Sequence, residues 1–202
     1  MGSRPTTCAL LIIDMISDFS FEDGEQLAAH AERVVGNIAR LKARFQAEKL
    51  PVIFVNDNYG RWDASFVDLV AWARREGSRG RDIATRLQPT DGDLFVLKPR
   101  HSGFYQTPLP SLLESKQVGK LVIVGVAGDS CVLNTAMDAH MRKFRLWVPC
   151  DGVASVTPER NERALAHLHE SVQVHTGPVA EIDARGTCDW PDAESGDGPE
   201  PA

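Results

Sequence analysis

The sequence predicts an α/β fold in which helices cover both faces of a mostly parallel six-stranded sheet. Six short apolar runs, which are typical of strands buried on both faces, alternate with segments whose apolar residues recur at helical spacing. No obvious hairpin signal joins one run to the next, so the strands need crossover connections. Because right-handed crossovers place helices on both faces of a sheet, we expect a three-layer α/β/α architecture of the Rossmann-like kind.

The first half of the chain supplies three strands and two helices. The run CALLIID is apolar until its final carboxylate, and VIFVND and DLFVLKP have a similar character. Apolar residues from Leu27 to Phe45 recur at helical spacing between the first two runs. The predicted elements are strands at 8–14, 52–57 and 93–99, and helices at 27–45 and 66–73.

The second half continues the alternation. Pro110 suits the first turn of a helix, and Asp129 or Ser130 can cap the next helix. Thr157 can cap the last one, which carries apolar residues on one side. The predicted helices are 109–116, one that begins after Asp129 or Ser130 and runs toward Phe144, and 159–170. The predicted strands are 120–128, 145–154 and 172–176.

Composition favours one soluble domain that binds a small molecule. The 202 residues are 43% hydrophobic, which suits a single domain over 1–186, and the acidic, Gly/Pro-rich segment 187–202 is expected to be a mobile tail. The net charge of -6 makes nucleic acid and anionic membranes unexpected partners. Since the sequence has neither a long apolar span nor a signal peptide pattern, we expect a cytoplasmic protein, assembled as a homo-oligomer.

The four cysteines are scattered along the chain. Cys8, Cys131, Cys150 and Cys188 include no CxxC pair, which argues against a disulfide framework and against a cysteine-based zinc site. We therefore expect reduced thiols.

Three reactive side chains lie at the carboxyl ends of predicted strands, where open α/β sheets bind their ligands. Asp14 closes the first strand, Lys98 closes the third, and Cys131 opens the helix after the fourth. Each also has a purely structural interpretation: Asp14 could cap a turn, Lys98 could be a solvated strand end, and Cys131 could be a packing residue. Their convergence on one edge of one sheet favours a catalytic group.

A thiol, an acid and an ammonium together suit nucleophilic catalysis. Asp14 can take the thiol proton and later hand it to a leaving amine, while Lys98 keeps Asp14 ionised. A helix N-terminus and the ammonium both favour a thiolate, whereas the Asp14 carboxylate opposes it. Since two positive charges act against one negative charge, we expect the pKa of Cys131 to lie below the roughly 8.5 of a free cysteine.

Three motifs resemble those of the isochorismatase-like cysteine hydrolases. They are DMISDF at 14–19, KPRHSGFYQTPL at 98–109 and GVAGDSCVLNTAMDA at 125–139, and the resemblance covers roughly residues 8–176. It implies a catalytic triad of Asp14, Lys98 and Cys131, and an oxyanion hole from the backbone N–H groups of Ala127 and Cys131. It also implies a cis peptide bond between Val126 and Ala127.

The sequence departs from the zinc-binding nicotinamidases of this superfamily. Those proteins have an aspartate followed two residues later by a histidine, whereas Asp57 is followed by Tyr59, and no histidine occurs between His30 and His101. We therefore expect no metal and no other cofactor.

Several side chains near the motifs are candidates for the substrate pocket. Arg100 could bind a substrate carboxylate through two parallel hydrogen bonds, or it could be a surface residue. The aromatic candidates could wall a planar amide or belong to the core. The predicted pocket residues are Phe19, Asn56, Tyr59, Trp62, Arg100 and Phe104.

The predicted function is hydrolysis of a C–N bond in a small amide, carbamoyl or ureido compound through a thioester on Cys131. Family members that hydrolyse the vinyl ether of isochorismate can lack the cysteine, so its presence favours C–N hydrolysis. A vinyl-ether hydrolase and a non-catalytic small-molecule binder are the alternatives. Binding alone requires no such combination of thiol, acid and ammonium.

Overall fold

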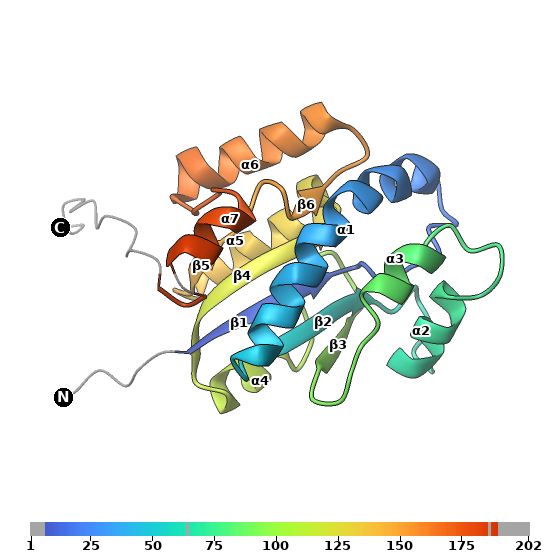
Figure 1. Ribbon diagram of the computed structural model, residues 1–202, viewed down its shortest axis with the longest axis horizontal. Coiled ribbons are helices and arrows are strands. Elements are labelled where there is room, and N and C mark those ends of the chain that lie inside the picture. Colours follow the sequence, from blue (N-terminus) through green and yellow to red (C-terminus); the bar gives the residue numbers. More distant parts are fainter. Residues whose placement is uncertain (1–6, 64, 186, 190–202) are drawn as a thin grey trace.

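A parallel sheet of six strands forms the middle of three layers in the computed structural model, which describes residues 7–63, 65–185 and 187–189 (Figure 1). Five strands follow the order β3-β2-β1-β4-β5, and β6 pairs with β4. Every strand pair is parallel. The strands are β1 (Thr7–Ile13), β2 (Val52–Asp57), β3 (Leu94–Lys98), β4 (Val118–Val126), β5 (Arg145–Trp147) and β6 (Val153–Ala154).

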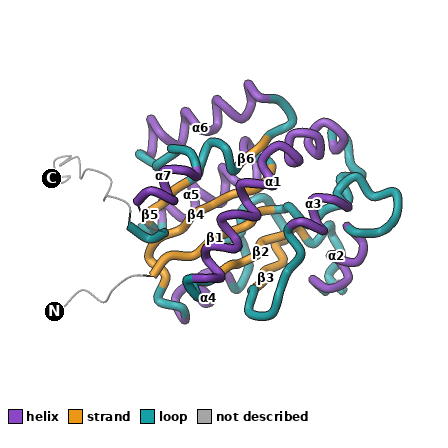
Figure 2. Tube along the Cα trace, in the orientation of Figure 1, coloured by secondary structure: helices purple, strands orange, loops and turns teal. Residues whose placement is uncertain are grey.

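Helices cover both faces of this sheet, which confirms the predicted α/β/α architecture. Figure 1 shows α1 across the near face and α5 behind β4, with the strands between them (Figure 2). The near face carries α1 (Gly24–Ala47), α2 (Phe66–Ala73), α3 (Arg81–Arg86) and α7 (Val179–Arg185), and the far face carries α4 (Leu109–Ser115), α5 (Leu133–Met141) and α6 (Pro158–Val172). No helix among the described residues is long and apolar enough to cross a membrane.

The alternation of side chains along β1 explains why its sequence is apolar without interruption. Cys8, Leu10 and Ile12 belong to the core under α1, whereas Leu11 and Ile13 belong to the core under α4 and α5. All five are fully buried. Burial of a large aliphatic side chain contributes about 1.5–3 kcal/mol, so the strand is held from both sides.

The last two predicted strands differ from the structure. The expected strand at 145–154 is divided into β5 and β6 by a turn in which the Gly152 amide donates to the carbonyl of Pro149. Pro149 has no N–H for a sheet ladder, which favours this break. The expected strand at 172–176 is wrong, because α6 continues to Val172 and only His175 forms a bridge, to Trp147.

The predicted helix caps are correct in part. Thr157 accepts a hydrogen bond from the Arg160 amide at 3.3 Å, as expected for a cap. Neither Asp129 nor Ser130 caps the helix after β4, which begins as a π-helical turn over Gly128–Val132. The Asp129 carboxylate instead lies 2.6 Å from the Arg160 guanidinium.

The chain after α7 returns to the start of β1. Cys188 forms a disulfide with Cys8, with Cα atoms 5.5 Å apart, so the expectation of four reduced thiols is wrong for this pair. Thr187 is 2% exposed, and its hydroxyl donates to Glu48 at 2.6 Å. The expected mobile tail therefore does not include its first two residues, and residues 190–202 lie outside the described part of the chain.

Gly125 is required by the close approach of β1 and β4. Its φ is +117°, and a Cβ atom built there would lie 2.1 Å from the Ile13 carbonyl oxygen. Ile13 pairs with Gly125 in the sheet, directly before the residues that carry the candidate site. Only glycine allows the two backbones to meet in this way.

We expect Gly125→Ala to lower the free energy of unfolding by more than about 3 kcal/mol, because the Cβ–backbone clash adds to the cost of the positive φ. Gly92→Ala is a matched control, since Gly92 has a φ of +96° but nothing within 4 Å of the built Cβ. Urea unfolding of both variants measures the difference. If both variants lost the same free energy of unfolding, the positive φ alone, without the clash, would explain why glycine occupies position 125.

We expect loss of the disulfide to lower the free energy of unfolding by about 2–5 kcal/mol, because it links residues 180 positions apart. Cys188→Ser should unfold at lower urea concentration than wild type without reductant, and dithiothreitol should abolish the difference. Cys150→Ser is the control, because Cys150 is exposed and free. Alkylation of Cys8 in native, unreduced protein would contradict the bond.

Candidate active site

The candidate site lies where the strand order reverses between β1 and β4, at the carboxyl edge of the sheet. Asp14 follows β1 directly, and Lys98 is the last residue of β3. Cys131 lies in the π-helical turn that follows β4, and Asp57 ends β2. Parallel strands bring these residues together because all their carboxyl ends share one edge.

The Lys98 ammonium is the centre of the contacts. Its Nζ lies 2.9 Å from Asp14 Oδ2, 3.5 Å from Asp57 Oδ2 and 3.4 Å from Cys131 Sγ. The other oxygen of Asp14 accepts a hydrogen bond from the Asp57 amide at 2.7 Å. The three residues predicted from the strand ends are therefore in direct contact.

The charge on Lys98 is stabilised although its side chain is 0% exposed. Burial acts to lower the pKa of Lys98, but Asp14, Cys131 and Asp57 more than offset it and hold the pKa above its ordinary value. The ammonium is therefore present throughout the neutral range, and it keeps a positive charge against the carboxylates and the sulfur.

The pKa of the Cys131 thiol is shifted in the direction opposite to the prediction. Burial and the adjacent Asp14 carboxylate raise the pKa of Cys131 to about 12, although Lys98 acts to lower it. The resting group is therefore a neutral thiol beside a carboxylate and an ammonium. The prediction of a lowered pKa weighed two positive charges against Asp14 and left out burial, which raises the pKa in the same direction as Asp14.

The backbone of the site carries two unusual conformations. Asp14 has a φ of 51°, in the left-handed region, and its amide donates to the Val55 carbonyl at 3.0 Å. The bond between Val126 and Ala127 is cis, as the resemblance implies. Ala127 directly precedes the π-helical turn Gly128–Val132, and Cys131 lies within that turn; their amides are the ones that the resemblance implies for an oxyanion hole.

Two predicted pocket residues, Tyr59 and Asn56, contact the segment that follows β1. Tyr59 is partly buried and hydrogen-bonds with the Ser17 hydroxyl, and burial together with the charge of Asp14 raises the pKa of its phenol. Asn56 is fully buried, and its amide donates to the Ile16 carbonyl at 2.8 Å. Its Oδ1 has no hydrogen-bond partner among the residues that the structure describes.

The other predicted pocket residues have different surroundings. Phe19 and Phe104 are buried in the two core clusters on opposite faces of the sheet, so they serve packing. Trp62 is 81% exposed, and Arg100 is exposed as well. Motif position alone could not distinguish a core aromatic from a pocket wall.

Sequence reasoning missed two residues of this site. Asp57 is a carboxylate at a strand end, like Asp14, and the same rule would have found it. The His101 Nδ1 atom lies 3.8 Å from Cys131 Sγ and 3.4 Å from the Ser130 hydroxyl. Its place three residues after Lys98 in the KPRHSGF segment was the available signal.

The residues present do not fit the metal site of the zinc-binding relatives. Asp57 Oδ1 accepts from the Tyr59 amide at 2.6 Å, and its Oδ2 faces Lys98. Within the described ranges there is no group of three or more His, Cys, Asp or Glu side chains placed to hold a metal ion. No step of the chemistry is therefore assigned to a metal.

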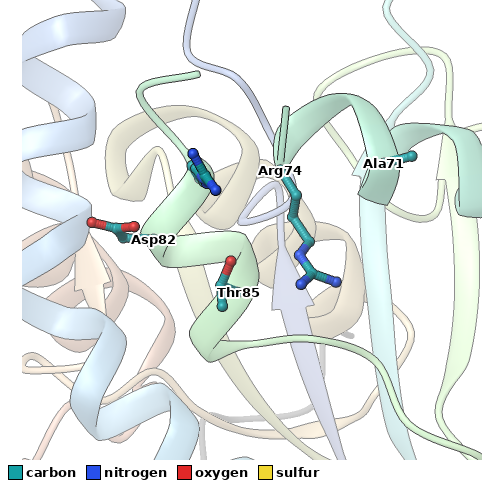
Figure 3. A pocket seen from close by; sticks show the side chains of 5 residues that line it. Ala71, Arg74, Asp82 and Thr85 are labelled. Carbon is teal, nitrogen blue, oxygen red and sulfur yellow. The ribbon is translucent and has the colours of Figure 1, made fainter. Parts of the chain in front are cut away.

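A separate surface pocket lies between α2 and α3 (Figure 3). It is lined by Ala71, Arg74, Arg81, Asp82 and Thr85, and it shares no residue with the cluster around Lys98. In Figure 3 the Arg74 side chain extends into the space beside Thr85.

Comparisons with known proteins find relatives of this chain in sequence and in structure. The bacterial protein YaaI of Bacillus subtilis (strain 168), an uncharacterized isochorismatase family protein, is 44% identical over 160 residues, which span 79% of this chain and 87% of that protein. The ureidoacrylate amidohydrolase RutB of Serratia proteamaculans (strain 568) is 26% identical over 209 residues, covering 89% of this chain and 82% of that protein. The crystal structure of N-carbamoylsarcosine amidase from Thermoplasma acidophilum superposes with a TM-score of 0.66 at 26% identity, covering 88% of this chain and 99% of that one.

A family model spans nearly the whole described chain. The model of the isochorismatase domain matches residues 8–178, which include Lys98 and the three residues around its ammonium. With the fold and the relatives above, this match shows that the chain belongs to the isochorismatase family.

Proposed function

We propose that the protein hydrolyses a C–N bond in a small amide, carbamoyl or ureido compound, with Cys131 as the nucleophile. The observation that carries the proposal is the contact of one ammonium with a carboxylate at 2.9 Å and a thiol at 3.4 Å. This set supplies a proton acceptor, a nucleophile and a fixed positive charge in one place.

Formation of the thioester uses Asp14 twice. Asp14 takes the proton from Cys131, and the resulting thiolate attacks the substrate's carbonyl carbon. The oxyanion that forms accepts hydrogen bonds from the backbone N–H groups of Ala127 and Cys131. As the C–N bond breaks, Asp14 gives its proton to the departing nitrogen, which leaves as ammonia or an amine.

Water then hydrolyses the thioester. Its oxygen bonds to the acyl carbon, the C–S bond breaks, and the sulfur regains a proton. The products are the acid and the restored thiol. Lys98 stays protonated throughout and offsets the negative charge that moves between Asp14 and the sulfur.

Two relatives support the bond type and the size of the substrate. The names of RutB and the Thermoplasma protein describe a ureidoacrylate amidohydrolase and an N-carbamoylsarcosine amidase. Both names describe action on a small molecule with a nitrogen-bearing carbonyl group. We extend that class to this chain and assign it no individual substrate, since specificity depends on loops around the site.

An ammonia-release screen over small amides, N-carbamoyl amino acids and ureas tests the function. We expect turnover of at least one compound, and Cys131→Ala should reduce it by at least about a thousandfold, because the nucleophile is lost. Cys150→Ala should leave turnover unchanged, since Cys150 is an exposed cysteine outside the site. Equal turnover by the Cys131 variant would contradict the proposal.

Lys98→Met tests the role of the ammonium. The variant leaves Asp14 and Asp57 together without a cation, so we expect a loss of about 3–5 kcal/mol in the free energy of unfolding, and little turnover in the folded fraction. Folding raises the pKa of Lys98 above its ordinary value of 10.5, so the stabilisation that it provides is fully present below that pH. The stability difference should therefore persist from neutral pH to about 10.5 and narrow only above it.

Lys42→Met provides the comparison for that experiment. Lys42 is another buried lysine, paired with Asp93 at 2.9 Å and remote from the thiol. Its loss should destabilise the protein yet preserve turnover per folded molecule. If both lysine variants had the same turnover, the charge at Lys98 would have only a structural role.

A further inference from the structure

A histidine stands on the open side of the Cys131 thiol. The His101 Nδ1 atom lies 3.8 Å from Cys131 Sγ, and His101 is exposed. Asp14 and Lys98, in contrast, are 9% and 0% exposed and contact the same site from within the protein. The sulfur is therefore flanked by one proton acceptor on the buried side and another on the solvent side.

The position of His101 is fixed by the residues that follow it. The Ser102 hydroxyl donates to the Asp138 carboxylate, and the Gly103 amide donates to the Thr135 hydroxyl at 3.0 Å. Both acceptors belong to α5, which continues directly from the turn that carries Cys131. The segment that carries His101 and the turn that carries Cys131 are therefore both attached to α5.

Close packing leaves this segment little freedom. A Cβ atom on Gly103 would lie 2.9 Å from a methyl group of Val55, so the segment lies directly against the sheet. Ser102 and Gly103 are also buried. The exposed imidazole therefore projects from a backbone that is held on two sides.

Asp14 and His101 differ in whether their proton-accepting atoms are already engaged with other groups of the protein. Both oxygens of Asp14 are engaged, one with Lys98 and the other with the Asp57 amide. His101 contacts only Ser130 and the sulfur among the partners found in the described chain. Water that attacks a thioester arrives from the solvent side, where the imidazole lies.

We propose that His101 is a second catalytic residue, which transfers the proton during hydrolysis of the thioester. This inference rests on the proposed function. The imidazole nitrogen takes a proton from water as the water oxygen bonds to the acyl carbon, and the C–S bond breaks. The imidazolium then returns that proton to the sulfur, so the acid leaves and the thiol is restored.

The raised pKa of Cys131 supports the proton transfer from His101 to the sulfur. A strongly basic thiolate is a poor leaving group, and burial with Asp14 raises the pKa of Cys131 to about 12. Departure of the sulfur is therefore aided by a proton donor within reach of it. His101 is such a donor once it has accepted the water proton.

The test separates thioester formation from thioester hydrolysis with p-nitrophenyl acetate as the probe. The reagent acetylates a nucleophilic thiol and releases p-nitrophenolate, whatever the natural substrate is. The acetyl-enzyme is freed of excess reagent by desalting, and its decay is followed by intact mass. The proteins compared are wild type and the variants His101→Ala, His101→Asn, His140→Ala and Cys131→Ala.

We expect both His101 variants to acquire the acetyl group on Cys131 and to lose it about a hundredfold more slowly than wild type, at the lower end of the effect of general acid–base catalysis. Asparagine can hydrogen-bond but cannot carry the proton, so it should not rescue the rate. Free imidazole added after desalting should accelerate decay in His101→Ala. His140→Ala, an exposed histidine near the end of α5, should match wild type.

Three outcomes would overturn the inference. Decay of the His101→Ala acetyl-enzyme at the wild-type rate would remove any role for the imidazole. A wild-type rate in His101→Asn would reduce that role to hydrogen bonding. A His101→Ala protein that gains no more acetyl label than Cys131→Ala, with no faster release of p-nitrophenolate by wild type than by Cys131→Ala, would refute the nucleophile itself, and with it both proposals.

Discussion

The Lys98 ammonium is buried at the end of β3 and touches two carboxylates and a thiol, and the rest of the site depends on this charge. An isolated ammonium in such a place would be costly, because burial removes its hydration. Asp14 and Asp57 offset that cost, and each would in turn repel the other without Lys98 between them. The three charges are therefore stable only as a group, which includes Asp14 in a left-handed backbone conformation.

Burial and the Asp14 carboxylate keep the Cys131 thiol neutral before substrate arrives. With a neutral thiol at rest, Cys131 is a weak nucleophile and a poor target for oxidation, since the thiolate is the reactive form. In the mechanism proposed above, the nucleophile is produced when Asp14 takes the proton, and a substrate carbonyl with the Ala127 and Cys131 amides receives the charge. That mechanism ties reactivity to a bound substrate, and it assigns the fixed ammonium the role of lowering the cost of each proton transfer.

The sequence predicted the meeting of Asp14, Lys98 and Cys131 better than it predicted the last strands and the cysteine pairing. Asp14, Lys98 and Cys131 could be found because parallel strands end at one edge, which makes residues far apart in sequence neighbours. The division of the strand at 145–154 depends on a turn at Pro149, and the pairing of Cys8 with Cys188 depends on the path of the chain after α7. Those features arise from tertiary contacts that no local pattern contains.

The protonation state of Cys131 in the resting protein tests the central claim most directly. The thiolate absorbs in the ultraviolet, so the difference between wild type and Cys131→Ala, both of which retain Cys150, isolates this one sulfur during a pH titration. We expect no thiolate signal from Cys131 up to about pH 9, because burial and Asp14 raise its pKa to about 12. A thiolate step below about pH 8.5, the ordinary value for a free cysteine, would contradict the central role given to the buried Asp14–Lys98 pair.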